Sequence, residues 1–117
     1  MSYVFDAGGE TVWSPSLRMG KLFVSMAETL ASNFDLDLPS AGFTAMASDY
    51  YYLDPPRLAA FVRTLLGSSV ASHPVYWQLA RGFLAICLVL LEECGVTVDG
   101  VPAELAEARD SLPELPK

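Results

Sequence analysis

Few side chains in this chain of 117 residues are suited to acid–base or nucleophilic chemistry. The single histidine, His73, precedes a proline at an expected helix start, so we interpret it as a helix cap or a surface residue. Serines are plentiful, but none lies in a nucleophile-elbow motif such as G-x-S-x-G. A serine–histidine–acid triad would have to be assembled from distant parts of the chain. The sequence therefore assigns no catalytic residue.

Metal and phosphate sites are also not expected from the spacing of possible ligands. Cys87 and Cys94 are seven residues apart on one expected helix, about 10 Å along its axis. A disulfide needs Cα atoms within about 7 Å, and two thiols with one histidine cannot form a structural zinc site. Asp35 and Asp37 lack the glycine and closing glutamate of a calcium loop. Gly8-Gly9 suits a hairpin turn and not a phosphate loop. We expect no metal and no cofactor.

Aromatic side chains, with two polar neighbours, form the best candidate binding set. Ligand pockets commonly combine aromatic walls with a few polar groups. Protein interfaces also concentrate aromatic residues, and plain core packing is the third interpretation. The candidate ligand- or partner-binding residues are Trp13, Asp49, Tyr50, Tyr51, Tyr52, His73, Tyr76 and Trp77.

Charge and hydrophobicity limit the kinds of partner. The 14 acids against 7 bases give a net charge of −7, which repels nucleic acid and favours solubility or a basic protein partner. Glu92-Glu93, at the negative end of an expected helix dipole, also suits a basic partner. The chain is 52% hydrophobic and 18% charged, against about 25% charged in typical domains. We therefore expect apolar surface to remain for a second copy, as a homodimer.

The expected compartment is the cytoplasm. Both cysteines are interpreted as reduced core residues, and the N-terminus lacks the basic flank and apolar run of a signal peptide. The apolar run Phe83–Leu91 is about half the roughly 20 residues that a membrane span needs. Gln78 and Arg81 interrupt its extension toward the N-terminus, so we expect no membrane association.

Three helices are predicted by capping residues and apolar periodicity. The first spans Pro15–Asn33 with Ser14 as its cap, and the second spans Pro55–Leu66 with Asp54 as its cap and Gly67 at its end. The third spans Pro74–Cys94, capped by Ser72 or His73, with 68–71 as the short link before it. Its second half has nine residues without a polar side chain and should be buried on every side. We expect Gly82 to mark close approach of another element, such as the first helix.

Strands are predicted where aromatic and β-branched residues gather. Tyr3–Phe5 and Thr11–Trp13 should form a hairpin around the glycine pair. A further strand is expected over roughly Met46–Leu53, although the alanine-rich start of the segment also suits a helical turn. Val96–Val98 could be a short strand or an extended loop, and Pro102–Ser111 a short surface helix.

These elements predict a single α+β domain over residues 1–112, with 113–117 as a frayed tail. Its short antiparallel sheet, the N-terminal hairpin plus one strand, packs against three helices in the order ββαβαα. The C-terminal helix is weak.

Short motifs of this chain resemble those of a family of small uncharacterised bacterial proteins. The motifs are Thr11-Val12-Trp13-Ser14-Pro15, Asp49-Tyr50, Ala60-Phe61-Val62, and Gly82-Phe83 with Val89-Leu90. The resemblance covers roughly residues 1–98. It implies the architecture above, and it implies no activity or catalytic residue because the family has none assigned.

The favoured function is a non-enzymatic, acidic accessory or interaction protein that binds or neutralises a basic protein partner. The alternative is a small-molecule binder or cyclase-like enzyme, with a pocket lined by Trp13, Asp49, Tyr50, Tyr52, His73 and Trp77. A pocket that joins His73 to Asp49 would favour the enzyme. A flat, exposed patch of tyrosines would favour the interaction protein.

Overall fold

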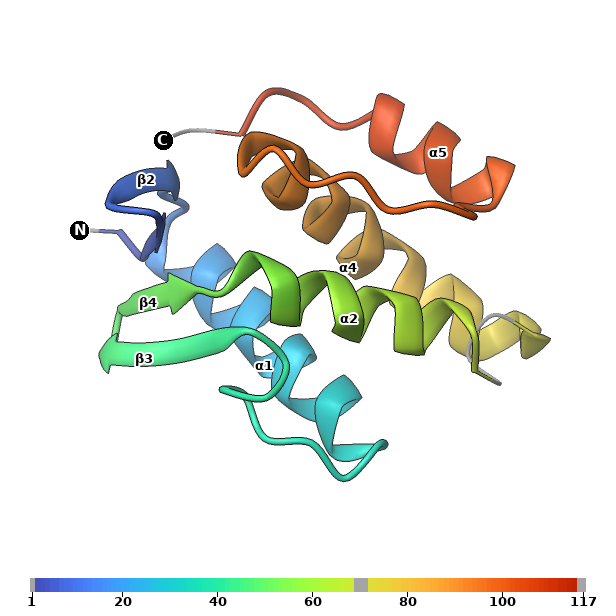
Figure 1. Cartoon of the computed structure of the whole chain (residues 1–117), viewed down its shortest axis with the longest axis horizontal. Coiled ribbons are helices and arrows are strands. Elements are labelled where there is room, and N and C mark those ends of the chain that lie inside the picture. Colours follow the sequence, from blue (N-terminus) through green and yellow to red (C-terminus); the bar gives the residue numbers. More distant parts are fainter. Residues whose placement is uncertain (1, 69–71, 116–117) are drawn as a thin grey trace.

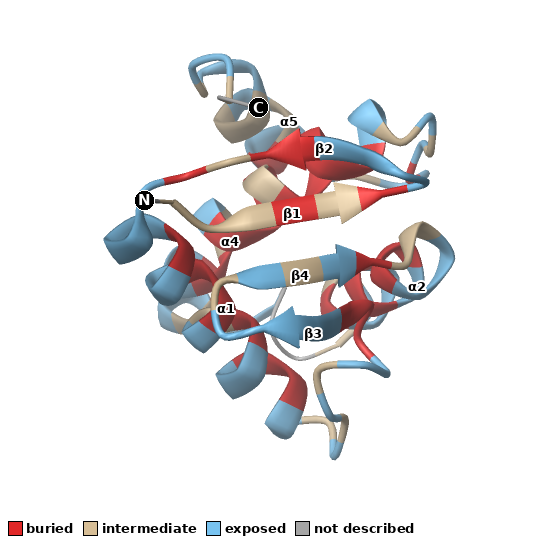
Figure 2. Cartoon of the chain, turned by 90° about the vertical axis from the view of Figure 1, so that its left-hand side faces the viewer, coloured by how far each residue is buried: buried red, intermediate tan, exposed pale blue. Residues whose placement is uncertain are grey.

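A computed structural model describes residues 2–68 and 72–115, so the expected link over 68–71 and the expected tail over 113–117 lie partly outside the described residues. The described chain is α+β, with a four-stranded mixed sheet and four helices in the order ββαββααα. Figures 1 and 2 show the helices on one side of the sheet, and the other face of the sheet uncovered. The elements are β1 (Val4–Ala7), β2 (Glu10–Trp13), α1 (Leu17–Ser32), β3 (Phe43–Ala47), β4 (Tyr50–Leu53), α2 (Pro55–Leu66), α4 (Pro74–Glu93) and α5 (Ala103–Asp110).

The sheet has one strand more than predicted, and its strands are not all antiparallel. The strand order is β2-β1-β4-β3; the β1–β2 and β3–β4 pairs are antiparallel, and the β1–β4 pair is parallel. The prediction of one strand over Met46–Leu53 was wrong because Ser48 and Asp49 form a turn inside that segment. The prediction of an antiparallel sheet was also wrong. The chain passes through α1 after the first hairpin, and β4 then pairs with β1 in parallel. The hairpin around Gly8 and Gly9, both with positive φ, is confirmed.

Helix α1 begins two residues later than predicted. Its cap is Ser16, whose hydroxyl accepts a hydrogen bond from the backbone N–H of Met19 at 3.2 Å. Ser14 instead donates its hydroxyl to the carbonyl oxygen of Tyr3 at 3.1 Å, and the N–H of Tyr3 donates to the carbonyl of Pro15 at 2.9 Å. Ser14-Pro15 therefore ties the N-terminal strand to the start of α1.

The observed bounds of helices α2 and α4 agree closely with those predicted from the sequence. The carboxylate of Asp54 accepts from the N–H of Arg57 at 3.2 Å, and Gly67 follows the last residue of α2. The Nδ1 of His73 accepts from the N–H of Tyr76 at 3.2 Å and so caps α4. Both predicted helices are confirmed, with α4 ending one residue earlier, at Glu93.

The C-terminal half of α4 is the central helix of the core. Every residue of Phe83–Leu91 is buried except Ile86, which is half-buried. Part of its cover comes from α5, which runs along α4 in Figure 1 and inserts Leu105, which is 0% exposed. Ion pairs Arg81–Glu104, at 2.6 Å, and Arg109–Glu92 join the two helices. Residues 96–98 form a loop and not a strand.

The prediction that another element of the same chain, such as α1, closely approaches Gly82 was wrong. A Cβ at this position would have no heavy atom within 4 Å, and the residue is exposed. The close approach occurs at Gly20 of α1, where a Cβ would lie 2.3 Å from the Cγ of Tyr3. A second close approach occurs at Gly42, where a Cβ would lie 2.7 Å from the backbone nitrogen of Leu58 in α2.

Helix α4 is also long and apolar enough to cross a bilayer, at 20 residues. In this fold 56% of its most apolar stretch is buried inside the chain. A core helix that crosses no membrane can have the same length and composition.

Candidate functional site

The eight candidate residues lie in separate parts of the molecule. Trp13, Tyr51 and Trp77 belong to the core or its margin, whereas Tyr50 and Tyr52 lie on the uncovered face of the sheet. Asp49 lies in the turn between β3 and β4, and Figure 1 shows this turn at the opposite end of the molecule from the start of α4. The remaining two, His73 and Tyr76, lie at that start.

The pocket expected for the alternative function is therefore not formed. It required His73 and Asp49 to meet, and the fold separates the elements that carry them. The imidazole of His73 serves as the cap of α4, and the backbone carbonyl of Asp49 accepts from the N–H of Val4 at 2.9 Å. Two of the expected pocket walls, Trp13 and Trp77, are buried.

Aromatic packing holds the buried candidates on the inner side of the sheet. The ring of Trp13 lies 5.3 Å from that of Phe5 and meets Phe23 edge-on at 5.1 Å. Tyr51 stacks on Tyr3 at 6.2 Å, and burial raises the pKa of its hydroxyl. Three consecutive tyrosines thus divide as strand geometry requires: Tyr51 points inward, and its two neighbours point outward.

On the outer face of the sheet, Asp6 links three strands. Its carboxylate accepts from the hydroxyl of Thr11 on β2 at 2.7 Å and from the hydroxyl of Tyr50 on β4 at 2.5 Å. The bond to Asp6 raises the pKa of Tyr50, because the carboxylate favours the protonated phenol. Tyr52 is the neighbour of Asp6 in the register of β1 and β4. We call these four residues the tyrosine–aspartate face: Asp6, Thr11, Tyr50 and Tyr52.

Negative charge is concentrated in the segments that build the sheet. Residues 1–16 and 34–56 supply all four strands, and they contain six acidic residues and no lysine or arginine. The chain as a whole has a net charge of −7. The nearest cation in sequence is Arg57, directly after these segments, which forms an ion pair with Asp54 at 3.6 Å. The six acids are Asp6, Glu10, Asp35, Asp37, Asp49 and Asp54.

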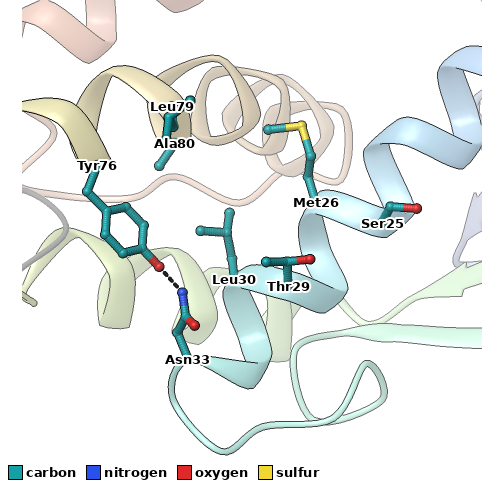
Figure 3. Close-up of a pocket in the computed structure, with 8 residues that line it drawn as sticks. All are labelled: Ser25, Met26, Thr29, Leu30, Asn33, Tyr76, Leu79 and Ala80. Atoms are coloured by element: carbon teal, nitrogen blue, oxygen red, sulfur yellow. Dashed lines mark hydrogen bonds between the residues drawn. The ribbon is translucent and has the colours of Figure 1, made fainter.

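A second surface of different chemistry lies between α1 and α4. Figure 3 shows a hollow whose polar end is closed by the side-chain amide of Asn33, which donates to the hydroxyl of Tyr76. Its volume is about 390 Å³, and a neighbouring hollow of about 270 Å³ shares Met26 and Leu79 with it. We call the two hollows and their rims the α1–α4 face. No aspartate or glutamate lines either hollow.

Sequence reasoning found Tyr76 and Trp13, which lines the second hollow, but missed the rest of this surface. The available signal was the spacing of Val75, Leu79, Gly82 and Ile86, at intervals of four, three and four. This is a second helical stripe, separate from the buried one. Val75 is 65% exposed and Leu79 is 71% exposed, so the stripe faces solvent at these two residues. Asp6 was missed because a single acidic residue in a short strand forms no recognisable sequence motif.

Within residues 2–68 and 72–115, no group of three or more histidine, cysteine or acidic side chains could hold a metal ion. The two cysteines are free thiols, and burial raises the pKa of both. A thiol held protonated in the core is a poor nucleophile.

Comparison with known proteins places the chain in a family. A family model described as "Family of unknown function (DUF6086)" matches residues 1–116, so the chain belongs to that family. The resemblance to an uncharacterised family is confirmed, over more of the chain than expected. No curated protein and no solved structure matches the chain.

Proposed function

We propose that this member of a family of unknown function is a non-enzymatic interaction protein that binds a basic protein partner through its tyrosine–aspartate face. The observation that carries the proposal is the uncovered sheet face with its tyrosines and Asp6, built by segments that contain six acids, of which Asp54 pairs with the adjacent Arg57. The partner presents arginine-rich surface, and binding of this face covers or neutralises it.

The chemistry of the face suits a guanidinium group. A carboxylate binds arginine through paired hydrogen bonds, and tyrosine rings attract cations over their faces. Asp6 is held by Thr11 and Tyr50, so little side-chain entropy is lost when a cation binds it. Tyr52, exposed and adjacent in register, supplies a ring free to stack on the ligand.

A reducing cytoplasm is the compartment that we propose. Its support is that both cysteines are free thiols, one of them fully buried.

A second candidate function is binding of a small apolar molecule by the α1–α4 face. Its support is the hollow of about 390 Å³, within the range of about 300–1,000 Å³ usual for ligand pockets. Asn33 and Tyr76 would supply the polar contacts at one end. Native mass spectrometry of the purified chain distinguishes this candidate, because a retained ligand adds a discrete mass that Leu79→Glu removes.

The proposed function is tested by fluorescence anisotropy with a labelled arginine-rich peptide, and with a glutamate-rich peptide as the negative probe. Asp6→Asn and Tyr52→Ala should each weaken binding about tenfold, equivalent to about 1.4 kcal/mol. Binding should also weaken as salt rises, because the contacts are exposed ion pairs.

The matched control is Glu107→Gln, which removes the same charge from the exposed surface of α5. It should change the affinity by less than about twofold, because a distant exposed charge is screened. Equal loss with Glu107→Gln and Asp6→Asn would indicate general attraction to an acidic chain, and the proposal would fail.

A further inference from the structure

We propose that the α1–α4 face joins two copies of this chain about a two-fold axis, with the two α4 helices crossing at Gly82. The inference is independent of the proposed binding of a basic partner, because it concerns another surface. It competes with the second candidate function, which uses the same face.

The α1–α4 face carries two exposed apolar stripes. On α4 the stripe is Val75, Leu79, Gly82 and Ile86, and on α1 it is Met19, Leu22 and Met26. Spacings of three and four repeat every seven residues, which is the spacing by which helices pack along a common seam. Met19 and Leu22 of α1 are more than half exposed, and so are Val75 and Leu79 of α4. Met26 and Ile86 are half-buried against the core, so each stripe is only partly covered within one chain.

The same face offers both a ridge and a groove. Leu79 projects from α4 at 71% exposure and stands at the rim of both hollows. A two-fold interface requires one patch to complement itself, so that a side chain of each copy fills a depression of the other. Leu79 and the hollow between Met26 and Ala80 meet this requirement.

Gly82 has no role inside one chain that explains a glycine. No atom lies within 4 Å of a Cβ built at this position, and φ lies outside the left-handed region. A mid-helix glycine lowers helix stability relative to alanine. In a crossing of two α4 helices, the missing side chain lets the backbones approach closely.

Charge permits a second copy at this face and disfavours a basic partner. The chain has 14 acidic residues, but none lines either hollow. Another copy, itself at −7, can therefore approach this face without bringing acids together. A basic partner, by contrast, finds no acid in the hollows to pair with.

A standard interface would extend beyond the two hollows of the α1–α4 face. A standard interface covers about 800 Å² per partner and about 20–30 residues a side. That area is about an eighth of the 6436 Å² surface of the chain. The two hollows are lined by 17 residues, because Met26 and Leu79 belong to both.

Sedimentation equilibrium of the full chain tests the proposal. The wild-type chain should reach about twice its 12.7 kDa mass at micromolar concentration, and Leu79→Glu should remain at 12.7 kDa. Leu17→Glu is the matched control, because Leu17 is an exposed leucine of α1 that lines neither hollow, and this variant should dimerise like the wild type. Circular dichroism of each variant confirms folding.

A monomeric wild-type chain at several hundred micromolar would overturn the proposal, and so would a dimer that Leu79→Glu leaves intact. A monomer that carries a bound apolar molecule would also overturn it, in favour of a ligand pocket.

Gly82→Ala tests the crossing point separately. In the Leu79→Glu background it should raise Tm by a few degrees, because alanine favours the helix and meets no neighbour. In the otherwise wild-type chain it should weaken the dimer at least tenfold. Unchanged dimer affinity would overturn a crossing at Gly82.

Discussion

The uncovered face of the sheet and the α1–α4 face differ in nearly every physical property. The first combines tyrosines with a carboxylate held by two hydroxyl groups, in segments that contain no cation. The second has leucine, methionine and valine at its rims and no acid in its hollows. The difference teaches that most exposed aliphatic side chains of this acidic chain lie on α1 and α4, although the sheet also exposes Met46 of β3.

An aromatic layer joins the two faces. Phe23 of α1 lies at its centre, with its ring 5.6 Å from Phe5 of β1 and 5.0 Å from Phe83 of α4. Phe43 of β3 meets the same ring at 5.8 Å. Each face therefore depends on this layer for its shape, although the two surfaces have different chemistry.

Phe23→Ala should have the largest effect, because it removes the ring that both faces share. Loss of a buried phenylalanine commonly costs about 3–5 kcal/mol in the free energy of unfolding. Urea unfolding followed by tryptophan fluorescence measures the change. A cost below about 0.5 kcal/mol, which is typical of surface substitutions, would mean that the layer does not support the two faces.

Substitutions of adjacent tyrosines should separate the inner and outer sides of the sheet. Tyr51→Ala should cost about 2 kcal/mol, because the half-buried ring stacks on Tyr3 and Phe5. Tyr52→Ala should change stability by less than about 0.5 kcal/mol, because its ring is exposed. Thermal unfolding of both variants checks this contrast, and equal losses would contradict the assigned orientations.

Two glycine substitutions should have opposite signs. Gly20→Ala forces a Cβ against the ring of Tyr3 and should destabilise the chain by about 1–3 kcal/mol. Gly82→Ala, measured in a monomeric background, should stabilise it by up to about 1 kcal/mol. Urea unfolding of the pair tests the comparison, and a destabilising Gly82→Ala would show a contact within one chain.

The smallest predicted effect is a difference between the two thiols in their rate of chemical labelling. Cys87 is fully buried and Cys94 is half-buried, and burial raises the pKa of both. In the native chain, Ellman's reagent should modify Cys94 slowly and Cys87 only on unfolding. Equal rates would show that the core beneath both faces opens readily. Cys94→Ser identifies the faster phase.

The helices could be predicted from sequence because their signals are local. Asp54 and His73 each cap the helix that follows, and apolar periodicity defines the buried stripe of α2. Strand pairing could not be predicted in the same way. The parallel pairing of β1 with β4 joins residues more than 40 positions apart, such as Val4 and Tyr50, and no local pattern encodes its direction.

The candidate site was predicted in its residue types and not in its arrangement. Tyr50 and Tyr52 were named as candidates, and strand alternation separates them from Tyr51. Which side points outward could not be predicted, because it depends on which face the helices cover. His73 and Asp49 were paired by residue type, although their places at the ends of distant elements keep them apart. Part of the cover for α4 was also missed, because α5 has a single fully buried anchor, Leu105.

A nitrogen–proton NMR titration of the isotope-labelled chain with an arginine-rich peptide tests the separation of the two faces most directly. The account predicts chemical-shift changes at backbone amides of β1, β2 and β4, centred on Asp6 and Tyr52, while the resonances of Leu22, Leu79 and Gly82 stay in place. Shifts centred on the α1–α4 face, or spread evenly over every acidic segment, would contradict it.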